Sequence, residues 1–227
     1  MKFILPVKCS QGHEFTVPVY DDEDFPVANC PHCEAPGYVM EQLTISRGGD
    51  RLLHRSKAEM DSGDFTLSII CSAVAVECFL TRAFLKWKGV ENISKAGHLP
   101  TEAEESVWEN EFPRTGGFPK PADFVSKALV GMSFDDFVAK NPTAQNMMNG
   151  FPAAAGKSAR DYFQATLFEK RNRIMHWGHL NFGKADAQLC HQISLAATGI
   201  LKMMDHERYS DMERSWRQAQ MPPSAAS

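Results

Sequence analysis

Two groups of residues in this chain have types and spacings that can do chemistry. Arg171, Asn172 and His176 lie within six residues, in a stretch whose pattern predicts a helix. A guanidinium group holds phosphate oxygens through a planar pair of donors, and imidazole transfers protons near neutral pH. Asn172 lies one turn before His176 and can orient the imidazole or a phosphate. The three residues therefore predict acid–base chemistry at a phosphate group.

The second group contains four metal-ligating residues within 25 positions: Cys9, His13, Cys30 and Cys33. They form two closely spaced pairs, and zinc prefers a tetrahedron of thiolate and imidazole ligands. Four protein ligands fill such a site and leave no open position for a substrate. The spacing therefore predicts a structural zinc ion, Zn2+, and not a catalytic one.

Two alternatives apply to this cluster. Cys30-Pro31-His32-Cys33 also matches the redox motif of thiol oxidases, but that use needs a helix N-terminus to stabilise a thiolate. The residues that follow, 34–37, start no helix, so the redox role is the less favoured one. His32 could replace His13 as the fourth ligand, although its place between two ligands makes the geometry awkward.

The Arg171 stretch belongs to a long amphipathic helix that we predict over residues 157–177. On a regular helical wheel Phe163, Leu167 and Ile174 form a face that points to the core. Phe168 and Met175 fall on other faces of that wheel. Two apolar side chains away from the core predict a second packing partner, and an isologous homodimer would supply one.

The same wheel separates Arg171 from His176 by about 140°. One helix therefore does not readily aim both side chains at a single phosphate. A groove between two antiparallel copies of the helix would combine the groups of both chains. The homodimer is thus also expected on chemical grounds.

The rest of the chain divides into a short β-rich part and a longer helical part. Residues 1–46 contain β-like runs and too few apolar residues for a core of their own, and Arg47-Gly48-Gly49-Asp50 is interpreted as a helix-breaking hinge. Helices are predicted at 51–60, 64–87, 101–111, 122–129, 134–139, 157–177 and 184–205, with Asp64 as the cap of the second. The expected fold is mainly α, a helical bundle at 50–220 preceded by a small β zinc ribbon at 1–46. Residues 221–227 are expected to be a flexible tail.

Glu77 is a lone carboxylate in the apolar pattern of the second predicted helix. A buried acid needs a partner, because an unpaired charge is costly in an apolar surrounding. One interpretation is a structural pair with Arg82 or another base. The other gives Glu77 a supporting role, in which it pairs with Arg171 or His176 and orients the site.

Composition limits the partners. The chain has 227 residues and a formal net charge of −4, and all of that excess lies in residues 1–49, which hold three basic and seven acidic residues. Such a ribbon is a poor binder of the nucleic-acid backbone, so RNA contacts are expected from the helical part. The apolar run at 65–81 is interrupted by Glu77, and we expect a buried helix there, no membrane association and a cytoplasmic location.

Taken with these helices, the Arg-Asn-x3-His arrangement resembles the signature of HEPN-family ribonucleases. The resemblance covers roughly residues 50–207 and includes the upstream helices, where Ser62-Gly63-Asp64-Phe65 and residues 73–77 are similar to the family's first helices. The irregular stretch 89–156 does not match a compact member. The resemblance implies a helical-bundle protomer, obligate pairing and an active site in the dimer groove.

The resemblance further implies a metal-independent endoribonuclease with RNA as substrate, in which Arg171, Asn172 and His176 are catalytic. Microbial members are often toxins or anti-phage effectors. The zinc ribbon would then recruit or sense a protein partner. Two alternatives stay open: a non-catalytic HEPN module whose groove binds nucleotide or RNA, and a zinc-dependent transcriptional or adaptor protein.

Overall fold

The computed structural model describes residues 2–9, 11, 13–20, 29–34, 37–39, 47–96, 101–113, 117–151, 154 and 156–220. The chain divides into two compact units, Met1–Thr44 and Ile45–Ser227. Each unit is described by itself below. The predicted tail at 221–227 lies outside the described residues.

The first unit contains a three-stranded antiparallel sheet with the strand order β2-β1-β3. Its strands are β1 (Lys2–Cys9), β2 (Glu14–Tyr20) and β3 (Gly37–Val39). Cys9 is the last residue of β1 and pairs with Gly37, the first residue of β3. The sheet therefore holds the end of β1 in place, where the first of the predicted metal ligands lies.

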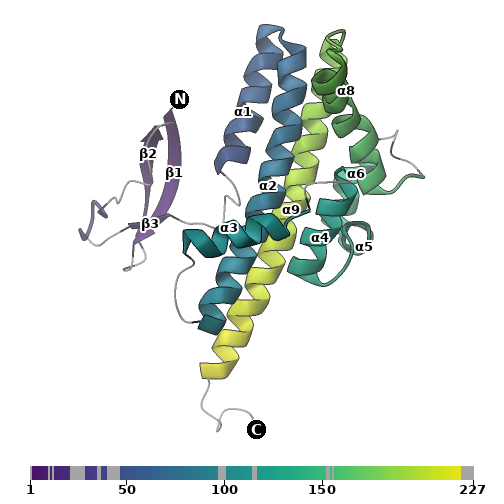
Figure 1. Ribbon diagram of the computed structural model, residues 1–227. Helices are drawn as coiled ribbons and strands as arrows, with labels where there is room; N and C mark the ends of the chain where they lie inside the picture. The colour runs from purple at the N-terminus through teal and green to yellow at the C-terminus, as the bar shows by residue number, and fades with distance from the viewer. Residues whose placement is uncertain are drawn as a thin grey trace. The chain divides into compact units, whose positions relative to one another are not determined.

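The second unit is helical, so the prediction of a mainly helical fold is confirmed (Figure 1). Its helices are α1 (Arg47–Ser62), α2 (Phe65–Ala96), α3 (Glu102–Glu111), α4 (Pro119–Val130), α5 (Phe134–Lys140), α6 (Pro142–Asn149), α7 (Ala159–Phe163), α8 (Glu169–Trp177) and α9 (Lys184–Gln220). The long helices α2 and α9 pack against each other, with α1 against the first half of α2 (Figure 1). The short helices α4 to α6 form a group of their own beside α9.

Helix α2 supplies the largest share of the core. Its side chains Ile69, Val76, Phe79 and Phe84 are completely buried, because apolar residues occur on nearly every face of this helix. The segment Phe65–Gly89 is long and apolar enough to cross a membrane by length and composition, but 61% of its most apolar window is buried inside the protein. That burial is what a core helix shows.

The predicted hinge at Arg47–Asp50 is wrong, because these residues form the first turn of α1. Glycine is used there for close packing. A Cβ atom at Gly49 would lie 2.5 and 2.6 Å from ring carbons of Phe79 on α2. A side chain at this position would push the two helices apart, and this advantage outweighs the poor helix propensity of glycine. The predicted cap of α2 is present: the Asp64 carboxylate accepts a hydrogen bond from the Leu67 amide at 2.9 Å.

A buried polar cluster joins α1, α2 and α9. The Ser56 hydroxyl is 2.7 Å from that of Ser72, 3.2 Å from that of Ser68 and 3.1 Å from Nδ1 of His191. Burial lowers the pKa of His191, with Lys57 adding to the effect, so the neutral imidazole is favoured. The cluster satisfies polar groups that would otherwise be unpaired between three packed helices.

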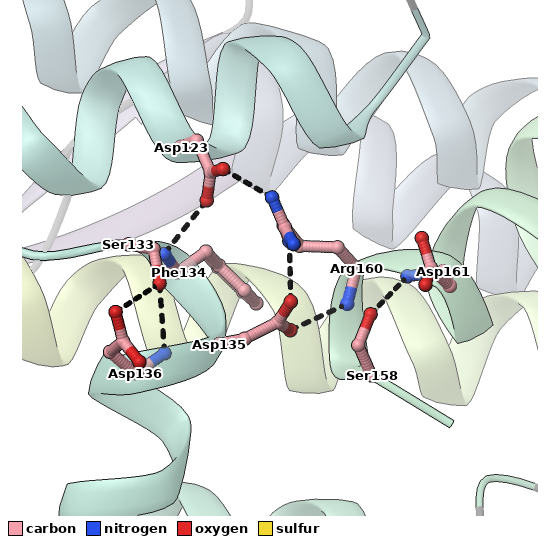
Figure 2. A network of polar contacts seen from close by, with 8 residues as sticks. All are labelled: Asp123, Ser133, Phe134, Asp135, Asp136, Ser158, Arg160 and Asp161. Atoms are coloured by element: carbon pink, nitrogen blue, oxygen red, sulfur yellow. Dashed lines mark hydrogen bonds and ion pairs between the residues drawn. The ribbon is translucent and has the colours of Figure 1, made fainter. Parts of the chain in front are cut away.

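Arg160 fixes the short helices of the 89–156 stretch to the rest of the unit. Its guanidinium group pairs with Asp123 on α4 and with Asp135 on α5, while its backbone amide also donates to Asp135 (Figure 2). Asp123 in turn accepts from the Phe134 amide at 3.0 Å. Three helices are thus joined through one arginine, which holds the start of α4 in a fixed position relative to α7.

Candidate functional site

The predicted helix at 157–177 is one continuous rod with a π-helical segment, Gln164–Phe168, between α7 and α8. Contacts from outside the rod stabilise this segment. The Gln164 side chain accepts a hydrogen bond from the Phe118 amide at 2.8 Å, and the Thr166 carbonyl accepts one from the Cys190 thiol at 3.6 Å. A π-helical turn contains one more residue than an α-helical turn, so the regular 100° step of the wheel does not hold within it.

The π-helical turn overturns the prediction for Phe168, which lies within it. This residue was expected to face away from the core, but it is 4% exposed and stacks on Phe118 with a centroid distance of 5.0 Å and an interplanar angle of 17°. Beyond the turn the wheel still holds, because Ile174 is 7% exposed and faces the core as predicted. Met175 is 59% exposed, in line with its expected position. Any second packing surface of this rod therefore involves Met175 and excludes Phe168.

Arg171 lies on the first half of α8 and pairs with Glu77 of α2. Nη2 of Arg171 is 3.0 Å from Oε2 of Glu77, and Nη1 donates to Oδ1 of Asn172 at 3.0 Å. Of the two interpretations of Glu77, the pair with Arg171 is present and a pair with Arg82 is not among the described contacts. Burial raises the pKa of Glu77 and the neighbouring Arg171 partly opposes this. The guanidinium keeps the other three of its five N–H groups without a partner among the described residues.

These residues border a pocket of about 520 Å³ within the helical unit. Its polar lining comes from the ion pair and its neighbours, and its apolar lining comes mainly from the connection between α3 and α4 and the start of α4. The lining residues are Glu77, Leu80, Thr81, Glu109, Phe112, Pro113, Gly117, Phe118, Pro121, Phe168, Arg171 and Asn172. The volume lies in the range of small-molecule sites.

His176 does not line this pocket. It is exposed in the last turn of α8, which ends at Gly178, where φ is 61° and the amide donates to the Ile174 carbonyl at 3.1 Å. Its sequence neighbours Met175 and Trp177 are 59% and 77% exposed. The structure therefore brings three of the predicted site residues together, Glu77, Arg171 and Asn172, and leaves His176 on a different, exposed side of the helix.

The apolar half of the pocket was not predicted from the sequence. It comes from Phe112, Phe118 and their neighbours, which lie in the irregular stretch that had no assigned role. The proline and aromatic content of residues 112–121 was the available signal, because such residues shape rigid apolar walls. What could not be read from that signal is that the wall faces Arg171.

The predicted metal ligands converge in the first unit. One donor atom from each of Cys9, His13, Cys30 and Cys33 lies within 4.8 Å of all the others, so the cluster could hold a metal ion. Sγ of Cys9 is 3.5 Å from Nδ1 of His13 and 3.6 Å from Sγ of Cys33, and Sγ of Cys30 is 3.7 Å from that Nδ1. A zinc tetrahedron has edges of about 3.8 Å between two sulfurs and about 3.6 Å between sulfur and nitrogen. The donors present therefore fit zinc in both type and spacing.

Local backbone geometry supports this cluster. The His32 amide points at Sγ of Cys30 at 3.4 Å, and residues 31–33 form a turn and not the start of a helix. Burial raises the pKa of the Cys9 thiol, but backbone N–H groups of His13 and Gln11 outweigh it and lower that pKa to about 6. His32 stands beside the cluster, with its ring 5.4 Å from that of His13, and is not one of the four converging donors.

No protein-family model matches this chain, and no significant match is found among curated proteins or solved structures.

Proposed function

We propose that this protein is a metal-independent endoribonuclease of the HEPN type that acts as a homodimer. One observation carries the proposal: Arg171 is held by Glu77 and Asn172 at the edge of a pocket, while His176 on the same short helix is exposed between two exposed apolar side chains. A phosphate clamp is thus fixed within the protomer. The proton-transfer group lies where a second molecule can reach it.

The reaction needs three roles. A base removes the proton of the 2′-hydroxyl, a cation stabilises the charge on the phosphate, and an acid protonates the departing 5′-oxygen. His176 serves the proton transfers, and the free N–H groups of Arg171 bind the phosphate oxygens. The 2′-oxygen bonds to phosphorus as the bond to the 5′-oxygen breaks. The products are then a 2′,3′-cyclic phosphate and a 5′-hydroxyl.

The dimer rests on the apolar surface around His176. Met175, Trp177 and Leu180 are 59%, 77% and 65% exposed, and they lie within six residues of one another. Large side chains concentrated in this way are typical of interaction sites. A two-fold axis near this surface would place His176 of one copy near Arg171 of the other. The two chains would then form one site together, which a single helix does not do because the two residues lie on different sides of it.

The first unit is assigned a structural zinc ion bound by Cys9, His13, Cys30 and Cys33, which makes it a small β zinc ribbon. Because it carries the excess of acidic residues, its role is to bind a protein partner and not RNA. Action as a cytoplasmic toxin or anti-phage effector belongs to the same proposal, since a partner-sensing ribbon gives a nuclease a means of control.

The test is cleavage of total RNA by the purified full-length protein, with mapping of the ends. His176→Ala and Arg171→Ala should each reduce cleavage by about 10²-fold or more, the usual scale for a positioned acid–base group. His179→Ala is the matched control, because this exposed histidine lies just beyond the helix end. Activity should persist in EDTA under conditions that leave the bound metal in place.

A mixture of the two inactive variants tests the shared groove. If each site combines Arg171 of one chain with His176 of the other, mixed dimers contain one intact site and part of the activity returns. Undiminished cleavage in both single variants would mean that α8 takes no part in the chemistry, and the proposed active site would be wrong. No cleavage by the wild-type protein would favour the alternative, a non-catalytic nucleotide- or RNA-binding module.

A further inference from the structure

The pocket beside Arg171 has two unlike halves. One half is the polar group of Glu77, Arg171 and Asn172, and the other is an apolar wall to which Phe112 and Pro121 contribute. The apolar wall belongs to the stretch between α2 and α7, which the chemistry proposed above does not use. Arg160 fixes α4, the helix that contains Pro121, through its ion pair with Asp123 (Figure 2).

The polar half offers donors and acceptors side by side. Oε1 of Glu77 and the amide nitrogen of Asn172 have no hydrogen-bond partner among the described residues, whereas Oε2 and Oδ1 are bound to Arg171. Thr81 adds a hydroxyl, which donates to the Glu77 carbonyl at 3.0 Å and keeps its acceptor capacity. A ligand with adjacent N–H and carbonyl or ring-nitrogen groups would satisfy both kinds of atom.

The charges of the lining exclude an anion from the interior. The guanidinium group of Arg171 in this lining is already paired with the carboxylate of Glu77. A phosphate deep in the pocket would approach that carboxylate, and like charges in a partly desolvated site repel strongly. The interior therefore suits a neutral, flat, partly polar group, and a phosphate attached to that group would remain outside near the free edge of Arg171.

We infer that the pocket binds one unpaired nucleobase, with its phosphate at Arg171. Unpaired bases are recognised by apolar or aromatic surfaces against their faces and by hydrogen bonds along their edges, which are the two features this pocket combines. The inference deepens the proposed function, on which it rests in one respect: the base belongs to the substrate strand. The stretch between α2 and α7 then determines which nucleotide lies beside the cleaved bond.

Binding is measured on full-length protein by calorimetry with three kinds of probe. These are the four nucleoside 5′-monophosphates, ribose 5-phosphate, which lacks a base, and a single-stranded 2′-O-methyl tetranucleotide, which cannot be cleaved. At least one monophosphate should bind about tenfold or more tightly than ribose 5-phosphate, as one buried base contributes. The tetranucleotide should bind more tightly still.

Two variants alter the pocket, each with a matched control. Thr81→Phe fills it, and Thr143→Phe places the same side chain at an exposed site on α6. Phe112→Leu removes an aromatic ring from the apolar wall, and Phe124→Leu is its control. The ring centroids of Phe112 and Phe124 lie 5.8 and 5.1 Å from that of Phe84, so both rings pack against the same neighbour. Only Phe112 is among the lining residues of the pocket. A melting curve equal to that of the control shows that a variant is folded.

The expected result is loss of the preference for bases in Thr81→Phe and Phe112→Leu, with both controls unchanged. If a mononucleotide binds as tightly as the tetranucleotide, the pocket is a base-binding site, but the base does not belong to the substrate strand. Unchanged binding in both pocket variants would overturn the inference, even if His176→Ala abolishes cleavage. If the protein binds bases specifically but cleaves no RNA, the base-binding site is supported and the proposed nuclease activity is contradicted.

Discussion

The two candidate sites of this protein are assembled in different ways. The metal cluster uses four residues within 25 positions, and turns next to β1, β2 and β3 bring them together. The Glu77–Arg171 pair joins residues 94 positions apart on two helices, and its geometry depends on a π-helical turn and on a wall from a third segment. A local site tolerates changes elsewhere in the chain, whereas the helical site depends on the packing of the whole unit.

Cysteines show the same contrast. Cys9 has a pKa lowered to about 6 and points into a cluster of donors. Cys190 is completely buried between helices, and burial raises its pKa to about 12. The same residue type is therefore a candidate ligand in one unit and a small core residue in the other, because backbone N–H groups surround the first thiol and apolar groups the second.

The largest effect should follow from disruption of the proposed metal site. Cys30→Ser should abolish stoichiometric zinc binding and unfold the first unit, because a structural zinc ion contributes about 10 kcal/mol or more to a small domain that lacks a core. The helical unit should keep its melting transition. Elemental analysis and circular dichroism measure the two results, and Cys78→Ser in α2 is the control. Wild-type protein purified without any bound metal would contradict the assignment.

The second effect concerns the reactivity of the buried thiol in the helical unit. At pH 7 a thiol with a pKa near 12 is thiolate in about one molecule in 10⁵. Cys190 should therefore stay unmodified by a thiol reagent until the helical unit unfolds, whereas Cys9 should be modified once the metal is removed and the first unit unfolds. Mass spectrometry of digested protein locates the label. Rapid labelling of Cys190 in folded protein would show that its surroundings are not those described.

The cysteine sites show which features can be predicted from the sequence. The ligand spacing identified all four donors and chose His13 over His32, because knuckle geometry is local and depends on few residues. Cys190 was expected to be a small core residue, and its complete burial confirms this. Its raised pKa follows from that burial between helices. Most helices were predicted, since their apolar periodicity and caps are also local signals.

The failures have one cause in common. Gly48 and Gly49 were interpreted as a hinge because glycine is a poor helix former, and only the position of Phe79 explains their place in α1. Phe168 was assigned to the wrong face because a π-helical turn is stabilised from outside, by Phe118 and Cys190. Both errors concern contacts between segments far apart in the chain. Such contacts cannot be detected from the spacing of apolar residues within one segment.

Gly49 gives the third prediction, which tests the dependence of the helical unit on packing. Gly49→Ala should destabilise it by about 1–3 kcal/mol, since the added Cβ would lie 2.5 Å from the Phe79 ring and the core is overpacked. Gly183→Ala is the matched control, because nothing lies within 4 Å of its added Cβ. Urea denaturation followed by circular dichroism measures both. Equal stability of the two variants would mean that α1 and α2 do not approach so closely.

The smallest effect concerns the ion pair itself. Glu77 and Arg171 are partly exposed, 41% and 27% for their side chains, so their coupling should contribute about 0.5 kcal/mol and no more than about 1 kcal/mol. A double-mutant cycle with Glu77→Gln and Arg171→Gln isolates this value. The parallel cycle with Arg82→Gln should give about zero, because no described contact joins Arg82 to Glu77. Equal coupling energies in both cycles would mean that Glu77 also pairs with Arg82, as the structural interpretation of Glu77 predicted.

The pH dependence of the same variants sharpens the result. Burial raises the pKa of Glu77 above its unfolded value, so the folded state binds the proton more tightly. The contribution of Glu77 to stability is then complete below its unfolded pKa, near 4.5, and is lost as the pH rises through the raised folded value. The free energy of unfolding of wild type minus that of Glu77→Gln should therefore fall as the pH rises from 4 to 7. A difference that increases over this range would mean that Arg171 stabilises the carboxylate more than burial disfavours it, and that the pair, like the metal cluster, is held by local charge and not by packing.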